Sequence, residues 1–153
     1  QEMDVYQVGV NIVCYSKFGQ RGADQTDEGI EIKPGVSVLS APLKFNMDGC
    51  VKFAYPHGHD ELLMVALENK SSRETLLRTV PEVGADGTFR DFRPHQVYRD
   101  DKGFTVTKRD DYEMVMVHHH PLQNPNIQHG MGNYLLYMTP GVCPQSANTA
   151  SAR

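Results

Sequence analysis

The chain has 153 residues, a formal net charge of −4 and 39% hydrophobic residues, so it is long enough for one domain with its own core. It has neither basic runs nor interleaved basic and aromatic residues, which argues against nucleic acid and favours a small neutral or cationic partner. Because no apolar run approaches the ~20 residues of a spanning helix, no membrane span is expected.

The dominant hydrophobic periodicity along the chain is two residues, which is typical of β-strands. Short segments rich in β-branched and aromatic residues recur between turn formers such as Lys33-Pro34-Gly35 and Met47-Asp48-Gly49. The predicted strands are residues 5–12, 36–39, 51–55, 62–67, 76–80, 104–107, 112–117 and 134–138. No segment has the pattern of an amphipathic helix. This spacing predicts an all-β fold, an antiparallel β-sandwich or jelly roll.

No linker, internal repeat or low-complexity block divides the chain. We therefore expect a single sandwich domain over residues 1–142. A flexible tail is expected over residues 143–153, because the end of the chain is small and polar.

The cysteines Cys14, Cys50 and Cys143 lie far apart and have no Cys-x-x-Cys spacing, which argues against zinc-ribbon and thioredoxin motifs. One pair could form a disulfide if the protein is exported, and the sequence leaves the choice of pair open. The chain begins with glutamine in place of methionine, as a mature exported form would. These features favour a secreted or periplasmic protein.

A candidate metal site is indicated by His57 and His59, which are separated by one residue just after a predicted strand. Side chains two residues apart on a strand point to the same side. Met131, flanked by glycines, comes from a distant segment and could approach closely. Two imidazoles and a thioether suit copper as Cu(I) and Cu(II), because copper accepts soft sulfur ligands. These three residues are the first-choice ligands.

A second histidine cluster follows the predicted strand at residues 112–117. On a regular strand His118 and His120 would share a face with Met114 and Met116, whereas His119 would lie on the other face. Methionines on strands are most simply core residues. The reserve metal ligands are His118, His120 and His129.

Two further interpretations of these residues remain open. A His-x-His pair also arises by chance, so the chain could be an all-β interaction domain with an incidental zinc ion or no metal. Asp60, which follows the pair, could accept a hydrogen bond from a ligand histidine and fix its tautomer, or it could be a solvated turn residue.

Four motifs in order carry a family resemblance: Pro34-Gly35, Phe53-Ala54-Tyr55, His57-Gly58-His59 and Met131-Gly132-Asn133, the last leading into an aromatic apolar strand. From about residue 27 to residue 138 the chain resembles the methionine-bearing copper domain of the copper type II ascorbate-dependent monooxygenases. This is the family of peptidylglycine α-hydroxylating monooxygenase and dopamine β-monooxygenase.

The resemblance implies that His57, His59 and Met131 bind copper and that Asn133 lies near a bound substrate. In the family this copper activates oxygen, and a substrate C–H bond is hydroxylated beside it. The family's second copper domain has no counterpart in this length, so the implied enzyme is a single-domain form with an external electron donor. Its substrate could be a small molecule or a peptide. The arginine that anchors a peptide carboxylate has no counterpart beside Tyr55, which argues against peptide amidation.

The alternative function is a non-catalytic copper carrier, storage or electron-transfer protein, in which the histidine triplet closes or duplicates the site. The sequence alone does not distinguish this non-catalytic function from the monooxygenase function.

Overall fold

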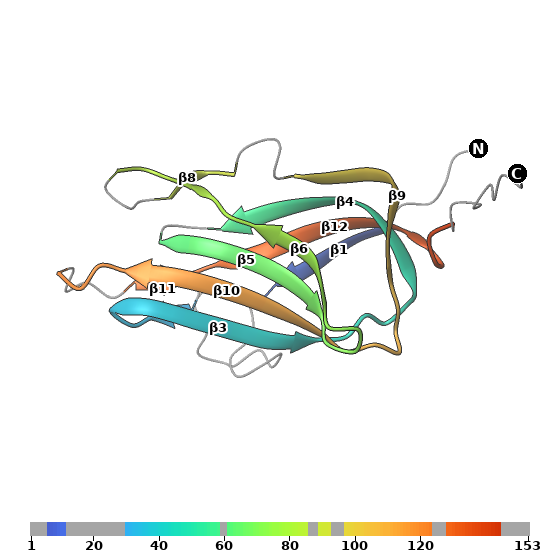
Figure 1. The fold of residues 1–153 in the computed structure, drawn as a ribbon, viewed down its shortest axis with the longest axis horizontal. Helices are drawn as coiled ribbons and strands as arrows, with labels where there is room; N and C mark the ends of the chain where they lie inside the picture. Colours follow the sequence, from blue (N-terminus) through green and yellow to red (C-terminus); the bar gives the residue numbers. More distant parts are fainter. Residues whose placement is uncertain are drawn as a thin grey trace, which may run out of the picture.

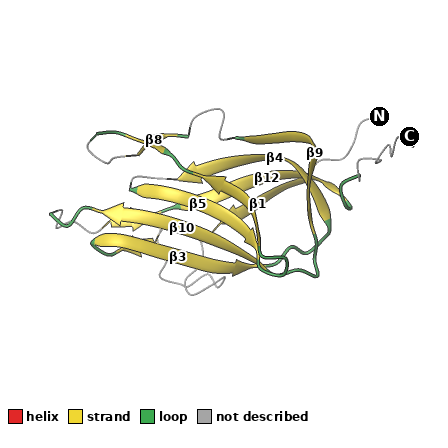
Figure 2. Ribbon diagram, in the orientation of Figure 1, coloured by secondary structure: helices red, strands yellow, loops and turns green. Residues whose placement is uncertain are grey.

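The computed structural model describes residues 6–11, 30–58, 61–85, 89–92, 97–123 and 128–144. The strands are β1 (Tyr6–Asn11), β2 (Ile30–Ile32), β3 (Gly35–Leu43), β4 (Gly49–Gly58), β5 (Leu62–Asn69), β6 (Glu74–Thr79), β7 (Glu82–Val83), β8 (Phe89–Asp91), β9 (Tyr98–Val106), β10 (Tyr112–His120), β11 (Gln128–Gly130) and β12 (Gly132–Pro140). Figure 2 shows strands and loops, and no helix, in this part of the chain.

Two antiparallel sheets packed face to face make up the body of the molecule (Figure 1). One sheet has the strand order β1-β12-β4-β9 and the other the order β3-β10-β5-β6. Two short antiparallel pairs, β11 with β2 and β7 with β8, complete the described strands. The predicted all-β sandwich is therefore confirmed, while the jelly-roll connectivity stays a prediction.

Every strand predicted from the sequence coincides with a strand of the two large sheets. The four strands that the sequence did not reveal, β2, β7, β8 and β11, are two or three residues long, too short to show a periodicity. The predicted strand at residues 51–55 extends to Gly58 and so contains Pro56 and His57. Proline fits there because β9 pairs with β4 only as far as Ala54, which leaves one side of β4 without a described partner strand at Pro56.

The core lies between the sheets and is built from alternating residues of each strand. Every second residue is buried from Tyr112 to His120 on β10 and from Gly132 to Met138 on β12. Met114, Met116 and Met138 are at most 1% exposed, which confirms their predicted place in the core. The main buried members are Phe45, Val51, Ala54, Leu62, Val65, Leu67, Leu77, Phe92, Val106, Tyr112, Met114, Met116, Tyr134, Leu136 and Met138.

One polar link joins the two sheets inside this core. Tyr134 of β12 donates its hydroxyl to the carbonyl oxygen of Val65 on β5 (3.0 Å) and lies 2.8 Å from the Thr79 hydroxyl on β6. Burial raises the pKa of Tyr134 far above its usual value, so this hydroxyl stays protonated. The link satisfies a buried polar group that would otherwise be unpaired.

A disulfide joins Cys50 on β4 to Cys143, with their Cα atoms 4.7 Å apart. Of the pairings that the sequence left open, this is the one that the structure contains, and Cys14 lies outside the described residues. The Cys143 N–H also donates to Thr105 Oγ1 at 3.0 Å, so the chain after β12 is held against β9 as far as Cys143. The tail predicted beyond it, residues 145–153, lies outside the described residues.

Across the residues that the structure describes, no helix is long and apolar enough to cross a membrane. The sequence-based expectation of no spanning helix agrees with this finding.

The disulfide closes a sequence separation of 93 residues, so it should restrict the unfolded chain strongly. We expect the double substitution Cys50→Ala and Cys143→Ala to lower the free energy of unfolding by about 2–5 kcal/mol, measured by urea denaturation. Reductant should lower the stability of the wild type and leave that of the double variant unchanged. An equal response of both proteins would contradict the prediction.

Candidate metal centre

His57 is the next-to-last residue of β4, and Met131 directly precedes β12. These ends of the two strands lie toward the left of Figure 1. In the antiparallel ladder His57 pairs with Asn133, and Gly58 pairs with Gly132. Paired residues share a face, so His57 and Asn133 lie on the same side of the sheet, and Met131, two residues before Asn133, is a diagonal neighbour of His57. This is the outer face, because the alternate residues Pro56, Gly58, Gly132 and Tyr134 are buried.

The His57 side chain is exposed, and Met131 and Asn133 are partly exposed. Diagonal neighbours on adjacent strands are close enough for long side chains to meet. The register therefore makes Asn133 the cross-strand partner of His57 and Met131 its diagonal neighbour, while ligation by His57 and Met131 stays a prediction. The third, His59, lies outside the described residues, as does Asp60.

On the inner face, the glycines that accompany these ligands let the core press directly against the backbone. A Cβ atom on Gly58 would overlap Leu62 Cδ2, and one on Gly132 would lie 2.7 Å from the sulfur of Met116. At Gly132, one of the glycines that flank Met131, the close approach is made by the core, and the approach of Met131 to the histidines stays a prediction. Leu62 and Met116 support the backbone next to the candidate ligands from beneath.

The second histidine cluster has the predicted alternation. His118 and His120 are buried, at 0% and 2% exposure, with Met114 and Met116, whereas His119 is exposed. His118 lies under Gly130, whose Cβ would be 2.8 Å from its Nε2 atom. Neither ring nitrogen of His118 has a hydrogen-bond partner among the described residues. Burial lowers the pKa of His118 to about 4, against a smaller opposing effect of the Glu61 backbone.

His120 has a partner that the sequence did not reveal. Its Nδ1 atom lies 3.2 Å from Oε2 and 3.4 Å from Oε1 of Glu61, and both side chains are buried. Because an ionised carboxylate can only accept, the His120 Nδ1–H donates. The inward position of Glu61 had one indication: Glu61 directly precedes β5, whose first residue is buried, so its side chain could also point inward. Its pairing with β10 could not be predicted, because the two segments are far apart in the sequence.

Within the described residues, no group of three or more His, Cys, Asp and Glu side chains is arranged to hold a metal ion. Glu61, His118 and His120 thus do not form a three-donor site as they are placed. His129 lies on β11, opposite Glu31, and its side chain is outside the described part. The set of His57, His59 and Met131 is not covered by this finding, because it includes a methionine and His59.

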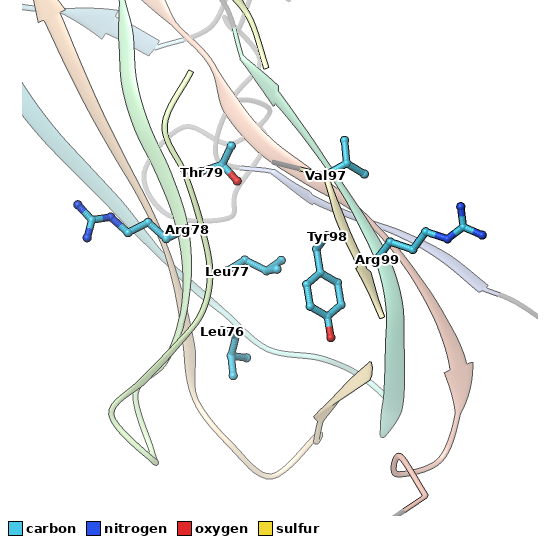
Figure 3. Close-up of a pocket in the computed structure, with 7 residues that line it drawn as sticks. All are labelled: Leu76, Leu77, Arg78, Thr79, Val97, Tyr98 and Arg99. Carbon is cyan, nitrogen blue, oxygen red and sulfur yellow. The ribbon is translucent and has the colours of Figure 1, made fainter. Parts of the chain in front are cut away.

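Two surface clefts lie away from the described candidate ligands. A cleft of about 500 Å³ opens between the sheet edges β6 and β9, and Figure 3 shows Tyr98 beside Leu77 with Arg78 and Arg99 extending outward in opposite directions. Thr79, at its margin, already contacts Tyr134. A cleft of about 550 Å³ includes the ion-paired Lys44 and Asp111. Among the described residues, neither a histidine nor Met131 lines either cleft.

Comparisons of the chain with protein-family models, with curated proteins and with solved structures give no match. The resemblance to copper monooxygenases consequently rests on the motifs of this chain and stays a prediction.

The buried His118 should make the metal-free protein less stable in acid. Its folded-state pKa of about 4 lies below its usual value of 6.5, so the unfolded chain takes up the proton first as the pH falls. Its contribution is therefore fully present above pH 6.5 and is lost between pH 6.5 and 4, by about 3 kcal/mol. Urea denaturation across this range should show a shallower pH dependence for His118→Leu than for the wild type.

The matched control is His119→Gln, which changes the exposed neighbour. It should keep the pH dependence of the wild type, because it leaves the buried His118 in place. Identical slopes for His118→Leu and the wild type would show that His118 does not carry the effect.

Proposed function

We propose that this chain is a copper-binding protein whose ion is held by His57, His59 and Met131, and that it acts as a single-domain copper monooxygenase with an external electron donor. The observation that carries the proposal is the β4–β12 register, which places His57 opposite Asn133 and diagonal to Met131 on an exposed sheet face. Residues from segments distant in the sequence thereby lie within reach of one ion.

The donor set fits copper better than the other common metals. A thioether favours Cu(I), whereas imidazole serves both oxidation states, and zinc and magnesium sites rarely use sulfur from methionine. The proposal requires His59 to join His57, as the two-residue spacing predicts. When bound, copper would supply one-electron redox chemistry and oxygen activation.

The chain's own residues would hold a substrate on the same outer face. Tyr55 is 46% exposed, and it pairs with Leu135 next to the His57–Asn133 pair. Further along the strands, Phe53 and Tyr137 meet edge to face with ring centroids 5.4 Å apart. Asn133 is partly exposed on this face and would lie beside the substrate through its exposed atoms, since its Oδ1 atom is buried. A small molecule or peptide with an apolar part suits this strip.

An exported location, secreted or periplasmic, is supported by the Cys50–Cys143 disulfide, since such bonds persist in oxidising compartments and are rare in the cytosol.

The second candidate, a non-catalytic copper carrier, storage or electron-transfer protein, is favoured by the exposure of His57 on an open sheet face. A copper ligand at such a surface can exchange its ion with a partner protein. The two candidates share the ligand set and differ in the reaction, so they are separable by experiment.

The thioether of Met131 should matter most for the reduced ion. We expect Met131→Ala to weaken Cu(I) binding about tenfold or more and Cu(II) binding much less, because sulfur prefers the softer ion. Competition titrations with chelators specific for each oxidation state measure both affinities. His57→Ala should weaken both.

Met64→Ala is the matched control, since Met64 is partly exposed on the other sheet, opposite Val117. It should leave both affinities at the wild-type values. Equal losses of Cu(I) and Cu(II) affinity in Met131→Ala would count against ligation by its sulfur.

The monooxygenase reaction predicts oxygen uptake coupled to substrate hydroxylation. With copper-loaded protein, ascorbate and a panel of small cations, neutral compounds and short peptides, one substrate should yield product in proportion to the oxygen consumed. His57→Ala should reduce this coupled uptake to the background of free copper and ascorbate. Tight copper binding without coupled product from any panel member would favour the carrier.

A further inference from the structure

Glu61 occupies an unusual position directly after the His57–His59 motif. Its backbone φ is +69°, a left-handed conformation that is rare for a residue with a side chain and that glycine adopts freely. Its side chain is nevertheless buried, and the residue is only 8% exposed. A conformation of this kind persists only where the surrounding contacts hold it.

Those contacts come from the end of β10 and use both the side chain and the backbone of Glu61. His120 Nδ1 is hydrogen-bonded to Glu61 Oε1 at 3.4 Å and lies 3.2 Å from Oε2, and the Glu61 carbonyl accepts the His119 N–H at 2.8 Å. These contacts fasten Glu61, directly before β5, to β10, the neighbouring strand of the same sheet.

Leu62, the next residue, continues this support beneath the ligand-bearing strands. It is fully buried and pairs with His118 on β10. Its side chain fills the space that a Cβ on Gly58 would occupy, and its Cδ1 atom lies 3.3 Å from the position of a Cβ on Gly132. These two glycines are the chain neighbours of His57 and Met131. One short segment thus touches the backbone beneath both ligands and is itself tied to β10.

We propose that the Glu61–His120 pair is a positioning element for the metal centre, holding Leu62 against Gly58 and Gly132 so that His57 and Met131 keep one geometry. The inference rests on the proposed copper site and adds to it a role for two buried residues that do not bind the ion. Glu61 and His120 are then positioning residues.

A contribution to stability alone would not explain the Glu61–His120 pair. Buried carboxylate–imidazole pairs contribute little net stability compared with apolar residues of similar size, because both groups lose their hydration. A left-handed glutamate adds strain at the same place. Residues that orient metal ligands, in contrast, typically change metal affinity tenfold to a hundredfold when they are replaced. The pair is therefore best explained by what it holds in place.

The experiment compares copper binding by the full chain carrying Glu61→Ala with that of the wild type. Removal of the carboxylate should weaken Cu(I) binding about tenfold to a hundredfold and should alter the Cu(II) electron paramagnetic resonance spectrum, as the ligand geometry becomes heterogeneous. Glu61→Gln keeps an acceptor for the His120 Nδ1–H and should restore most of the affinity and the wild-type spectrum. His120→Ala breaks the same bond from the other side and serves if Glu61→Ala does not fold.

The matched control is Glu113→Ala, which removes the carboxylate that pairs with Lys70 at 2.8 Å near the opposite end of β10. It should change neither the affinity nor the spectrum. Folded Glu61→Ala or His120→Ala protein with wild-type copper affinity and spectrum would overturn the positioning role and leave the proposed function intact. Failure of the wild type itself to bind copper would overturn both.

Discussion

The pairing of β4 with β12 is the constraint on which the candidate site depends. Strand alternation has a period of two, so a slip of one residue would turn His57 inward and Gly58 outward. The core enforces the observed register, because Leu62 and Met116 occupy the space that side chains at Gly58 and Gly132 would need. The glycines at Gly58 and Gly132, which have no side chains on the inner face, thus keep the candidate ligand His57 on the outer face.

The same end of the sandwich contains most of the buried polar groups. Glu61, His118 and His120 are buried there, and the other buried polar side chains among the described residues are Asn69 and Thr79, of which Thr79 contacts Tyr134. Unpaired buried polar groups are destabilising, and His118 has no described hydrogen-bond partner. Such groups tend to occur where structure is held for a function. Leu62 links the two clusters that the sequence shows as separate motifs, because it pairs with His118 and packs against Gly58, the neighbour of His57.

The features visible in the sequence are the local ones. Alternation over a few residues predicted every long strand and placed His118 and His120 inward with His119 outward. The contact of Glu61 with His120 and the pairing of Cys50 with Cys143 depend on how distant segments meet, which no local pattern encodes. The short strands β2 and β11 form through pairing with each other rather than through their own sequence.

The proposed metal site combines an exposed ligand face with a rigid base, and each part has its own requirement. Exchange of oxygen, electrons or copper needs access from solvent, which the open outer face gives to His57. A copper ion that changes oxidation state needs ligands whose spacing stays fixed, since loosely held ligands would rearrange at every electron transfer. A surface loop offers access without rigidity, and a buried site offers rigidity without access. The paired strands β4 and β12 meet both requirements at one end of the sandwich, because their outer face is open and their glycines rest on Leu62 and Met116.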